Sequence, residues 1–121
     1  MNKRQVGDYY ESLACAYLKK NGAKVIDRNY RALRGEIDII AMDGKYLSFI
    51  EVKYRRDSGF GSPEDAVTFS KQRQICKLSK LYLYSKNKSF DIPIRYDVIA
   101  ITDIDNTATI RWYKNAFEYV G

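Results

Sequence analysis

The fold of this chain is decided by residues 35–54, which read GEIDIIAMDGKYLSFIEVKY. Two apolar runs rich in β-branched residues, Glu36–Met42 and Tyr46–Tyr54, stand on either side of Asp43-Gly44, a dipeptide typical of tight hairpin turns. The sequence therefore predicts an antiparallel β-hairpin. Because the second run holds a Phe-Ile pair and a Val, we expect a central strand there rather than an edge strand.

Acidic side chains recur on one face of this hairpin. Side chains alternate along a strand, so Asp38 shares a face with Glu36, and Glu51 shares a face with Lys53. With Asp43-Gly44 as a two-residue turn, Asp38 lies diagonal to Glu51 on the same face. A slip of two residues would put them directly opposite, and a slip of one would separate them. Either even register brings the two carboxylates within several Å of each other, with Lys53 one step further along.

Two converging carboxylates repel each other, and a bound divalent cation relieves that repulsion. Mg²⁺ fits Asp38 and Glu51 because it prefers oxygen ligands, and the Val52 carbonyl is a further candidate. Lys53 beside such an ion could orient or deprotonate a water and balance charge on a phosphate. This set indicates metal-assisted hydrolysis of a phosphodiester. The alternative is a solvated strand face with an ordinary Glu-Lys ion pair.

The rest of the chain predicts two helices and three further strands. The first helix covers residues 5–20, and the second opens at Ser62-Pro63-Glu64-Asp65 and runs to about Lys86, with room for a break near Thr68–Ser70. The strands are residues 24–30 (at an edge, given their charges), Ile94–Thr102 and Ala108–Tyr113. The order α-β-β-β-α-β-β indicates a mixed α/β fold with a central sheet flanked by helices, in a single domain spanning residues 1–121.

Composition narrows the chemistry and the partners. The chain has 121 residues and no His, which excludes a Ser-His-Asp triad, a Cys-His dyad and a His general base. Its 21 Lys and Arg against 15 Asp and Glu give a net charge of +6, which favours a polyanionic partner, nucleic acid first. The alternative is a basic protein without such a partner.

The two cysteines and the N-terminus indicate the cellular compartment of the protein. Cys15 and Cys76 each lie among apolar neighbours and form no Cys-x-x-C pair, so we expect buried free thiols and a reducing compartment. The charged N-terminus lacks the apolar region of a signal peptide, and no apolar run approaches the length of a membrane span. We therefore expect a cytoplasmic protein without membrane association.

Two helical residues stand beside this constellation. Glu11 is in helical phase with Gly7, Ala14 and Leu18, at the margin of the apolar stripe. Lys71 shares a stripe with Ile75, Leu78 and Tyr82. Each is either a rim residue whose charged end reaches water or a member of a polar site where helices meet the sheet.

The residues also resemble a known family. Asp38 followed by Glu51-Val52-Lys53 resembles the PD-(D/E)xK core of restriction-endonuclease-like nucleases, with Ile37 in place of the nominal proline. Nearly the whole chain resembles the bacterial YraN family of predicted endonucleases, relatives of archaeal Holliday-junction resolvases. The matching stretches include Gly7 with Glu11, Gly35-Glu36-Ile37-Asp38, Phe49-Ile50-Glu51-Val52-Lys53, Lys71, Arg95-Tyr96-Asp97-Val98 and Asn115-Ala116-Phe117.

The resemblance implies roles for matching residues. It implies a Mg²⁺- or Mn²⁺-dependent endonuclease with Asp38 and Glu51 as metal ligands, Lys53 as the catalytic lysine and Glu11 as the helix-one glutamate. It assigns no firm role to Lys71 or Asp97. The substrate expected is DNA, branched or flapped, with products that carry 5′-phosphates.

Basic residues flank the motif and mark where nucleic acid would lie. We expect phosphate contacts from Arg34, Arg55, Arg56, Lys71 and Arg73. No base-reading helix of a known type is apparent, so we expect recognition of backbone or structure. Two rivals remain: a non-catalytic nucleic-acid-binding module with the same fold, and a nuclease directed at RNA. Junction cleavage would favour a homodimer with two sites.

Overall fold

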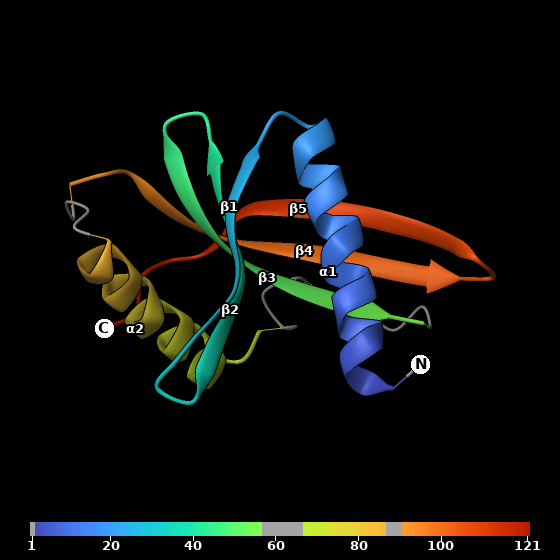
Figure 1. Cartoon of the computed structure of the whole chain (residues 1–121), viewed down its shortest axis with the longest axis horizontal. Helices are drawn as coiled ribbons and strands as arrows, with labels where there is room; N and C mark the ends of the chain where they lie inside the picture. The colour runs from blue at the N-terminus through green and yellow to red at the C-terminus, as the bar shows by residue number, and fades with distance from the viewer. Residues whose placement is uncertain (1, 57–66, 87–90) are drawn as a thin grey trace.

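The computed structural model describes residues 2–56, 67–86 and 91–121 of the chain (Figure 1). Its helices and strands follow the predicted order, and neither described helix is long and apolar enough to span a bilayer. The elements are α1 Lys3–Lys20, β1 Lys24–Ala32, β2 Gly35–Asp43, β3 Tyr46–Arg55, α2 Phe69–Ser85, β4 Ile94–Ile104 and β5 Thr107–Phe117.

Within the described residues, five strands form one mixed sheet in the order β1-β2-β3-β4-β5. Neighbouring strands are antiparallel except β3 and β4, which are parallel. Because parallel neighbours cannot be joined by a tight turn, the chain crosses over between them, and α2 lies in that crossover. The predicted position of β1 at an edge is confirmed, and so is the mixed α/β class.

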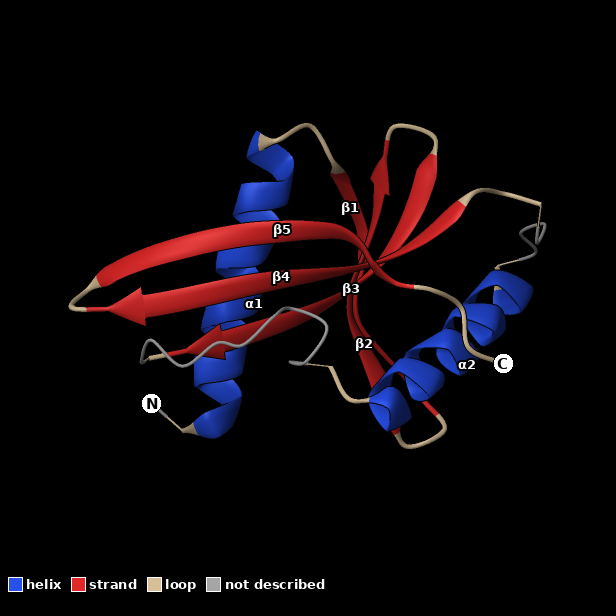
Figure 2. Ribbon diagram, turned by 180° about the vertical axis from the view of Figure 1, so that it is seen from behind, coloured by secondary structure: helices blue, strands red, loops and turns tan. Residues whose placement is uncertain are grey.

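The two helices cover opposite faces of the sheet. Helix α1 lies in front of the strands in Figure 1 and behind them in Figure 2. Leu18 of α1 belongs to a buried cluster with Ile50, whereas Leu78 of α2 belongs to a second cluster with Phe49. Phe49 and Ile50 are consecutive on β3, so their side chains point to opposite faces. The core is therefore two layers of side chains separated by the sheet.

The β2–β3 hairpin is present, but its turn is shifted from the predicted one. Asp43 pairs with Tyr46, so the turn residues are Gly44 and Lys45. Gly44 has a φ of 59°, which suits the first position of a type II′ hairpin turn. Asp43 is held in the strand by an ion pair with Arg95 at 2.8 Å. The prediction of Asp43-Gly44 as the turn is thus wrong because a tertiary contact extends the strand.

This shift decides how the two carboxylates meet. The pairing of β2 with β3 ends at Ile39 and Ile50 on the side away from the turn. Continued by one residue, the same register places Asp38 opposite Glu51. The observed hairpin is therefore the two-residue slip, and the diagonal arrangement is wrong.

Helix α2 begins later than the sequence predicted. Thr68 has an extended backbone, and its side chain accepts a hydrogen bond from the backbone N–H of Lys71 at 3.2 Å, so the helix starts at Phe69. Residues 67–68 are not helical, so a helix that runs unbroken through the possible break near Thr68–Ser70 is wrong. The predicted start at Ser62-Pro63-Glu64-Asp65 lies outside the described residues.

Strand β5 runs to Phe117 instead of ending at Tyr113, and a fully buried carboxylate holds the extension. Asp97 accepts a hydrogen bond from the backbone N–H of Asn115 at 2.8 Å, beside an irregularity in the β4–β5 pairing. It also accepts hydrogen bonds from side chains on three strands: Ser48, Arg95 and Trp112. Asp97 therefore joins β3, β4 and β5.

Both cysteines are free. Cys76 is buried in the core on the α2 side, and the backbone N–H of Val120 lies 3.4 Å from its sulfur. Cys15 is only partly buried. The expectation of a buried thiol is therefore right for Cys76 and wrong for Cys15, which lies at the margin of the α1 stripe.

Candidate functional site

Asp38 lies where β2 leaves β3. Its Oδ2 accepts a hydrogen bond from the backbone N–H of Val52 at 2.8 Å, in the place of a backbone carbonyl. Ile37 and Ile40 are three residues apart, yet both enter the core on the α2 side, so the alternation of side chains along β2 is interrupted between them. Burial, and then the nearby Glu51 carboxylate, raise the pKa of Asp38 well above its ordinary value. The site therefore holds two neighbouring carboxylates, and the charged form of Asp38 is disfavoured there.

Val52 contributes backbone atoms to this place. In an extended strand the N–H and C=O of one residue point in the same direction. The N–H of Val52 faces Asp38, so its carbonyl also faces the β2 side. That direction is the one a carbonyl ligand needs to stand beside the Asp38 carboxylate.

Glu51 is buried, with 4% of its side chain exposed, and two lysines flank it. The Nζ atoms of Lys53 and Lys71 lie 3.8 Å and 4.0 Å from the same oxygen, Oε2. Lys71 also donates a hydrogen bond to Oε1 of Gln74 at 3.2 Å. Thus α2 brings Lys71 to the site, and its predicted place on the core-facing stripe of that helix is confirmed.

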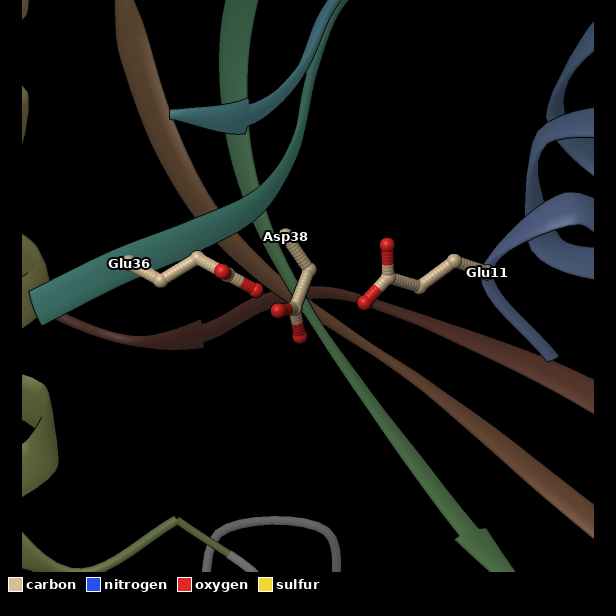
Figure 3. A group of neighbouring side chains, drawn as sticks. All are labelled: Glu11, Glu36 and Asp38. Atoms are coloured by element: carbon tan, nitrogen blue, oxygen red, sulfur yellow. The ribbon is translucent and has the colours of Figure 1, made fainter. Parts of the chain in front are cut away.

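A third and a fourth carboxylate approach Asp38. One oxygen each of Glu11, Glu36 and Asp38 lies within 4.8 Å of the others. Figure 3 shows the Asp38 carboxylate between that of Glu36, also on β2, and that of Glu11, which reaches across from α1. The helical phase of Glu11 left it either a rim residue or a member of a polar site, and the resemblance assigned it to the site; in the structure its carboxylate lies beside that of Asp38.

Glu11 is the least satisfied of these groups. Its Oε1 is buried without a hydrogen-bond partner among the described residues, and Nη2 of Arg28 is 3.9 Å away. Burial raises the pKa of Glu11 to about 7, and the Glu36 carboxylate adds to the effect. An oxygen in this state is available to a cation.

Glu36 is the site residue that sequence reasoning missed. The period-two alternation of β2 placed it on the face of Asp38, and that signal was sufficient to include it. In the structure its Oε2 also accepts a hydrogen bond from Nε of Arg31 at 2.7 Å, across the β1–β2 hairpin. Glu36 therefore links the acidic cluster to the basic residues at the hairpin turn.

Comparisons with known proteins agree on one family. Residues 10–101 match the family described as "Uncharacterised protein family UPF0102". The chain belongs to this family. Its UPF0102 relatives include a protein of Carboxydothermus hydrogenoformans, 40% identical over 98% of this chain and 100% of its own length, and one of Geobacter sulfurreducens, 50% identical over 89% and 84%. A third, of Lachnoclostridium phytofermentans, is 41% identical over 100% and 99%.

In this UPF0102 member, some predicted phosphate-binding residues lie beside the carboxylates. Arg34 and Lys71 line a hollow of about 500 Å³, and Glu36 and Gln74 line it as well. The backbone of Gly35 touches Gln74 so closely that an added Cβ would lie 2.5 Å from its side chain. This contact seats the β1–β2 turn on α2.

The other predicted phosphate contacts lie further off in the UPF0102 chain. Arg73 is on the outer side of α2 and lines a second hollow. Arg55 and Arg56 follow the end of β3, where Arg55 donates to the Tyr54 carbonyl at 3.1 Å. Neither Arg55 nor Arg56 is among the described residues that line the two hollows. The structure thus brings Arg34 and Lys71 to the acidic cluster and leaves Arg55, Arg56 and Arg73 around it.

Proposed function

We propose that this UPF0102 chain is a Mg²⁺- or Mn²⁺-dependent endonuclease that hydrolyses DNA phosphodiester bonds. The observation that carries the proposal is the meeting of carboxylates from three elements beside two lysines: Glu11 from α1, Glu36 and Asp38 from β2, and Glu51 from β3. A structural role for so many acids is unfavourable, because each raises the energy of the next charge. A divalent cation bound among these carboxylates would offset their mutual repulsion.

The residues present fit a divalent cation. The buried oxygen of Glu11 has no hydrogen-bond partner within the described residues, which is the state of a ligand atom without its metal. Asp38, Glu51 and the Val52 carbonyl would hold the ion, with Glu11 and Glu36 beside them. When bound, such an ion lowers the pKa of a water molecule and offsets charge on the scissile phosphate.

The chain's own residues supply the remaining chemistry. The hydrogen bond from Val52 fixes the Asp38 carboxylate in one orientation. Lys53, held beside Glu51, can direct an attacking water and stabilise charge on a phosphoryl oxygen. Lys71 and Arg34 face the same hollow as Glu36 and can bind the neighbouring phosphate.

The substrate follows from charge and from resemblance. A net charge of +6 and the basic residues around the hollow favour a polyanion. The resemblance to PD-(D/E)xK nucleases and Holliday-junction resolvases supports DNA of branched or flapped structure. The two free cysteines support a cytoplasmic location. If four-way junctions are the substrate, we expect a homodimer, because resolution needs two cuts.

The test is a cleavage assay on linear, flapped and four-way-junction DNA with Mg²⁺, Mn²⁺ or EDTA. Wild type should cleave only with a divalent cation, whereas Asp38→Asn and Lys53→Ala should each reduce the rate by about 100-fold or more. Lys45→Ala, at the far hairpin turn, is the matched control and should cleave normally. Cleavage in EDTA, or cleavage unchanged by both site variants, would contradict the proposal.

Binding without cleavage on every DNA would favour the non-catalytic module instead. Structured and single-stranded RNA assayed in parallel separates the RNA-directed alternative. If RNA is cleaved in preference to DNA and the same residues are required, the proposed mechanism stands and the substrate is RNA.

A further inference from the structure

A second hollow adjoins the candidate site along the outer side of α2. Its volume is about 660 Å³, and its lining includes Leu33, Phe69, Arg73, Lys77, Leu78 and Tyr119. Gln74 lines both this hollow and the smaller one that contains Lys71, so the two are neighbours. A continuous surface therefore leads from the acidic cluster past Lys71 and Gln74 to Phe69.

The charge of this hollow suits a polyanion. Arg73, Lys77 and Lys80 line it, and no Asp or Glu is among its described lining residues. Nζ of Lys80 lies 4.9 Å from the centre of the Tyr119 ring, whereas Arg73 and Lys77 form no ion pair with any residue that the structure describes. Arg73 and Lys77 therefore face the hollow without a described Asp or Glu side chain to neutralise them.

The same hollow exposes apolar side chains. Leu33 and Phe69 are each 62% exposed at its rim. Phe69, Arg73 and Lys77 follow one another at intervals of four residues on α2, so the aromatic ring and the cations form one stripe. Proteins bind single-stranded nucleic acid with this combination of an exposed ring and a row of cations, because bases stack on the ring and phosphates contact the cations.

The turn that presents Leu33 is strained. Leu33 and Arg34 have φ values of 50° and 60°, a conformation that Gly, Asn and Asp adopt far more readily than bulky residues do. Each side chain lines one of the two hollows. A cost of this kind in the backbone is typical of positions retained for binding.

We infer that this hollow binds an unpaired nucleic-acid strand beside the point of cleavage. A base stacks on Phe69 and Leu33, and the phosphates on either side contact Arg73 and Lys77. The inference rests on the proposed function, which supplies the nucleic acid at the adjoining carboxylates. A duplex cannot stack a base in this hollow, because each of its base faces is covered by a neighbouring base pair. The preferred substrate is thus DNA in which a single strand leaves a duplex.

The test measures binding in EDTA, where cleavage is absent. The probe is a single-stranded oligonucleotide that carries one 2-aminopurine, whose fluorescence falls on stacking, and the comparison is the matched duplex. Phe69→Ala should weaken single-strand binding by about tenfold and abolish the quenching, with duplex binding changed less than about twofold. Phe69→Trp should retain both properties, and Phe69→Leu should lose the quenching.

Control variants separate this hollow from general effects. Tyr9→Ala removes another exposed ring, on α1, and should leave single-strand binding unchanged. Arg73→Ala should weaken binding of the single strand more than that of the duplex. Phe69 is largely exposed, so its variants should melt at the wild-type temperature.

Three outcomes would overturn the inference: unchanged single-strand binding in Phe69→Ala, equal losses for single strand and duplex, or displacement by poly-glutamate as effective as displacement by the oligonucleotide. The last would assign the hollow to an acidic protein partner. Failure of the proposed function looks different: Asp38→Asn and wild type would both bind the single strand, and neither would cleave any DNA.

Discussion

The Asp38 carboxylate accepts the backbone N–H of Val52 at 2.8 Å, at the point where the β2–β3 ladder ends. A side chain thus takes over a hydrogen bond that the backbone would otherwise make. Glu51, the residue before Val52, faces Asp38 as a result. The position of the acidic pair is fixed by a main-chain atom, which does not depend on the charge of either acid.

The first prediction separates stability from activity at this residue. Asp38→Asn keeps an oxygen acceptor for the Val52 N–H and removes a buried acid whose charged form is disfavoured, so the free energy of unfolding in EDTA should stay equal or rise by about 1 kcal/mol. Denaturation by urea measures it. A loss greater than about 1 kcal/mol would show that the charge itself stabilises the fold.

A second prediction concerns pH. The pKa of Glu11 is about 7 in the folded chain against an ordinary 4.5, so the folded state binds more protons between these values. The stabilisation is fully present below pH 4.5 and is lost as the pH rises through 7, and Asp38 acts in the same direction. In EDTA, the free energy of unfolding should therefore fall over this interval. Glu11→Gln should flatten the curve, and an unchanged slope would contradict the assignment.

Divalent cations should reverse the repulsion. At a tenfold excess of Mg²⁺ or Mn²⁺ over the dissociation constant, the melting temperature near pH 8 should rise by about 5 °C relative to EDTA at equal ionic strength. The rise should vanish in Asp38→Asn and persist in Asp105→Asn, which changes an exposed carboxylate at the β4–β5 turn. An equal rise in both variants would indicate a general salt effect.

One substitution in the strained turn should raise the stability of the chain and weaken its binding of single strands. Leu33→Asn places a residue that tolerates positive φ where the turn requires it, so the chain should gain about 1 kcal/mol of stability. Single-strand binding should weaken at the same time, because one apolar wall of the hollow is removed. Urea denaturation and anisotropy on the same samples measure both. If stability rises and single-strand binding is unchanged, the strained turn does not contribute to binding at the hollow.

Asp97 provides a prediction about the sheet. Its carboxylate is fully buried and accepts hydrogen bonds from Ser48, Arg95, Trp112 and the Asn115 backbone. Asp97→Ala leaves Arg95 buried without this partner and should cost about 3–5 kcal/mol in the free energy of unfolding. Asp105→Ala is the exposed counterpart and should cost far less. Similar losses in the two variants would contradict a special role for Asp97.

Local patterns in the sequence were sufficient for the elements and for most of the acidic site. Alternation in the hairpin brought Asp38 and Glu51 together, whereas helical phase left Glu11 either a rim residue or a site member, and the resemblance assigned it to the site. The register needed more, because the ion pair of Asp43 with Arg95 joins residues 52 positions apart. Turn propensities depend only on adjacent residues, and they favoured Asp43-Gly44 as the turn.

The basic surface was the least predictable part. Lys71 was recognisable from the apolar stripe of its helix, whereas Gln74, which holds it, gave no signal. The second hollow depends on how the β1–β2 turn rests on α2, a contact that Gly35 permits by lacking a side chain. Sequence spacing marked Arg73 as a candidate but could not show which residues surround it.

The parallel pairing of β3 with β4 has a consequence for the order of folding. The crossover must dock α2 before Lys71 can reach Glu51, and Glu11 must arrive from the opposite end of the chain. Contacts this distant in sequence form late, because they require closure of long loops. A nascent chain that has emerged only as far as β3 carries Glu11 and the acids of the hairpin, but neither Lys71 nor β4. The proposed site is therefore assembled only after α2 and β4 have been translated, because α2 brings the second lysine to Glu51 and β4 pairs with the strand that carries it.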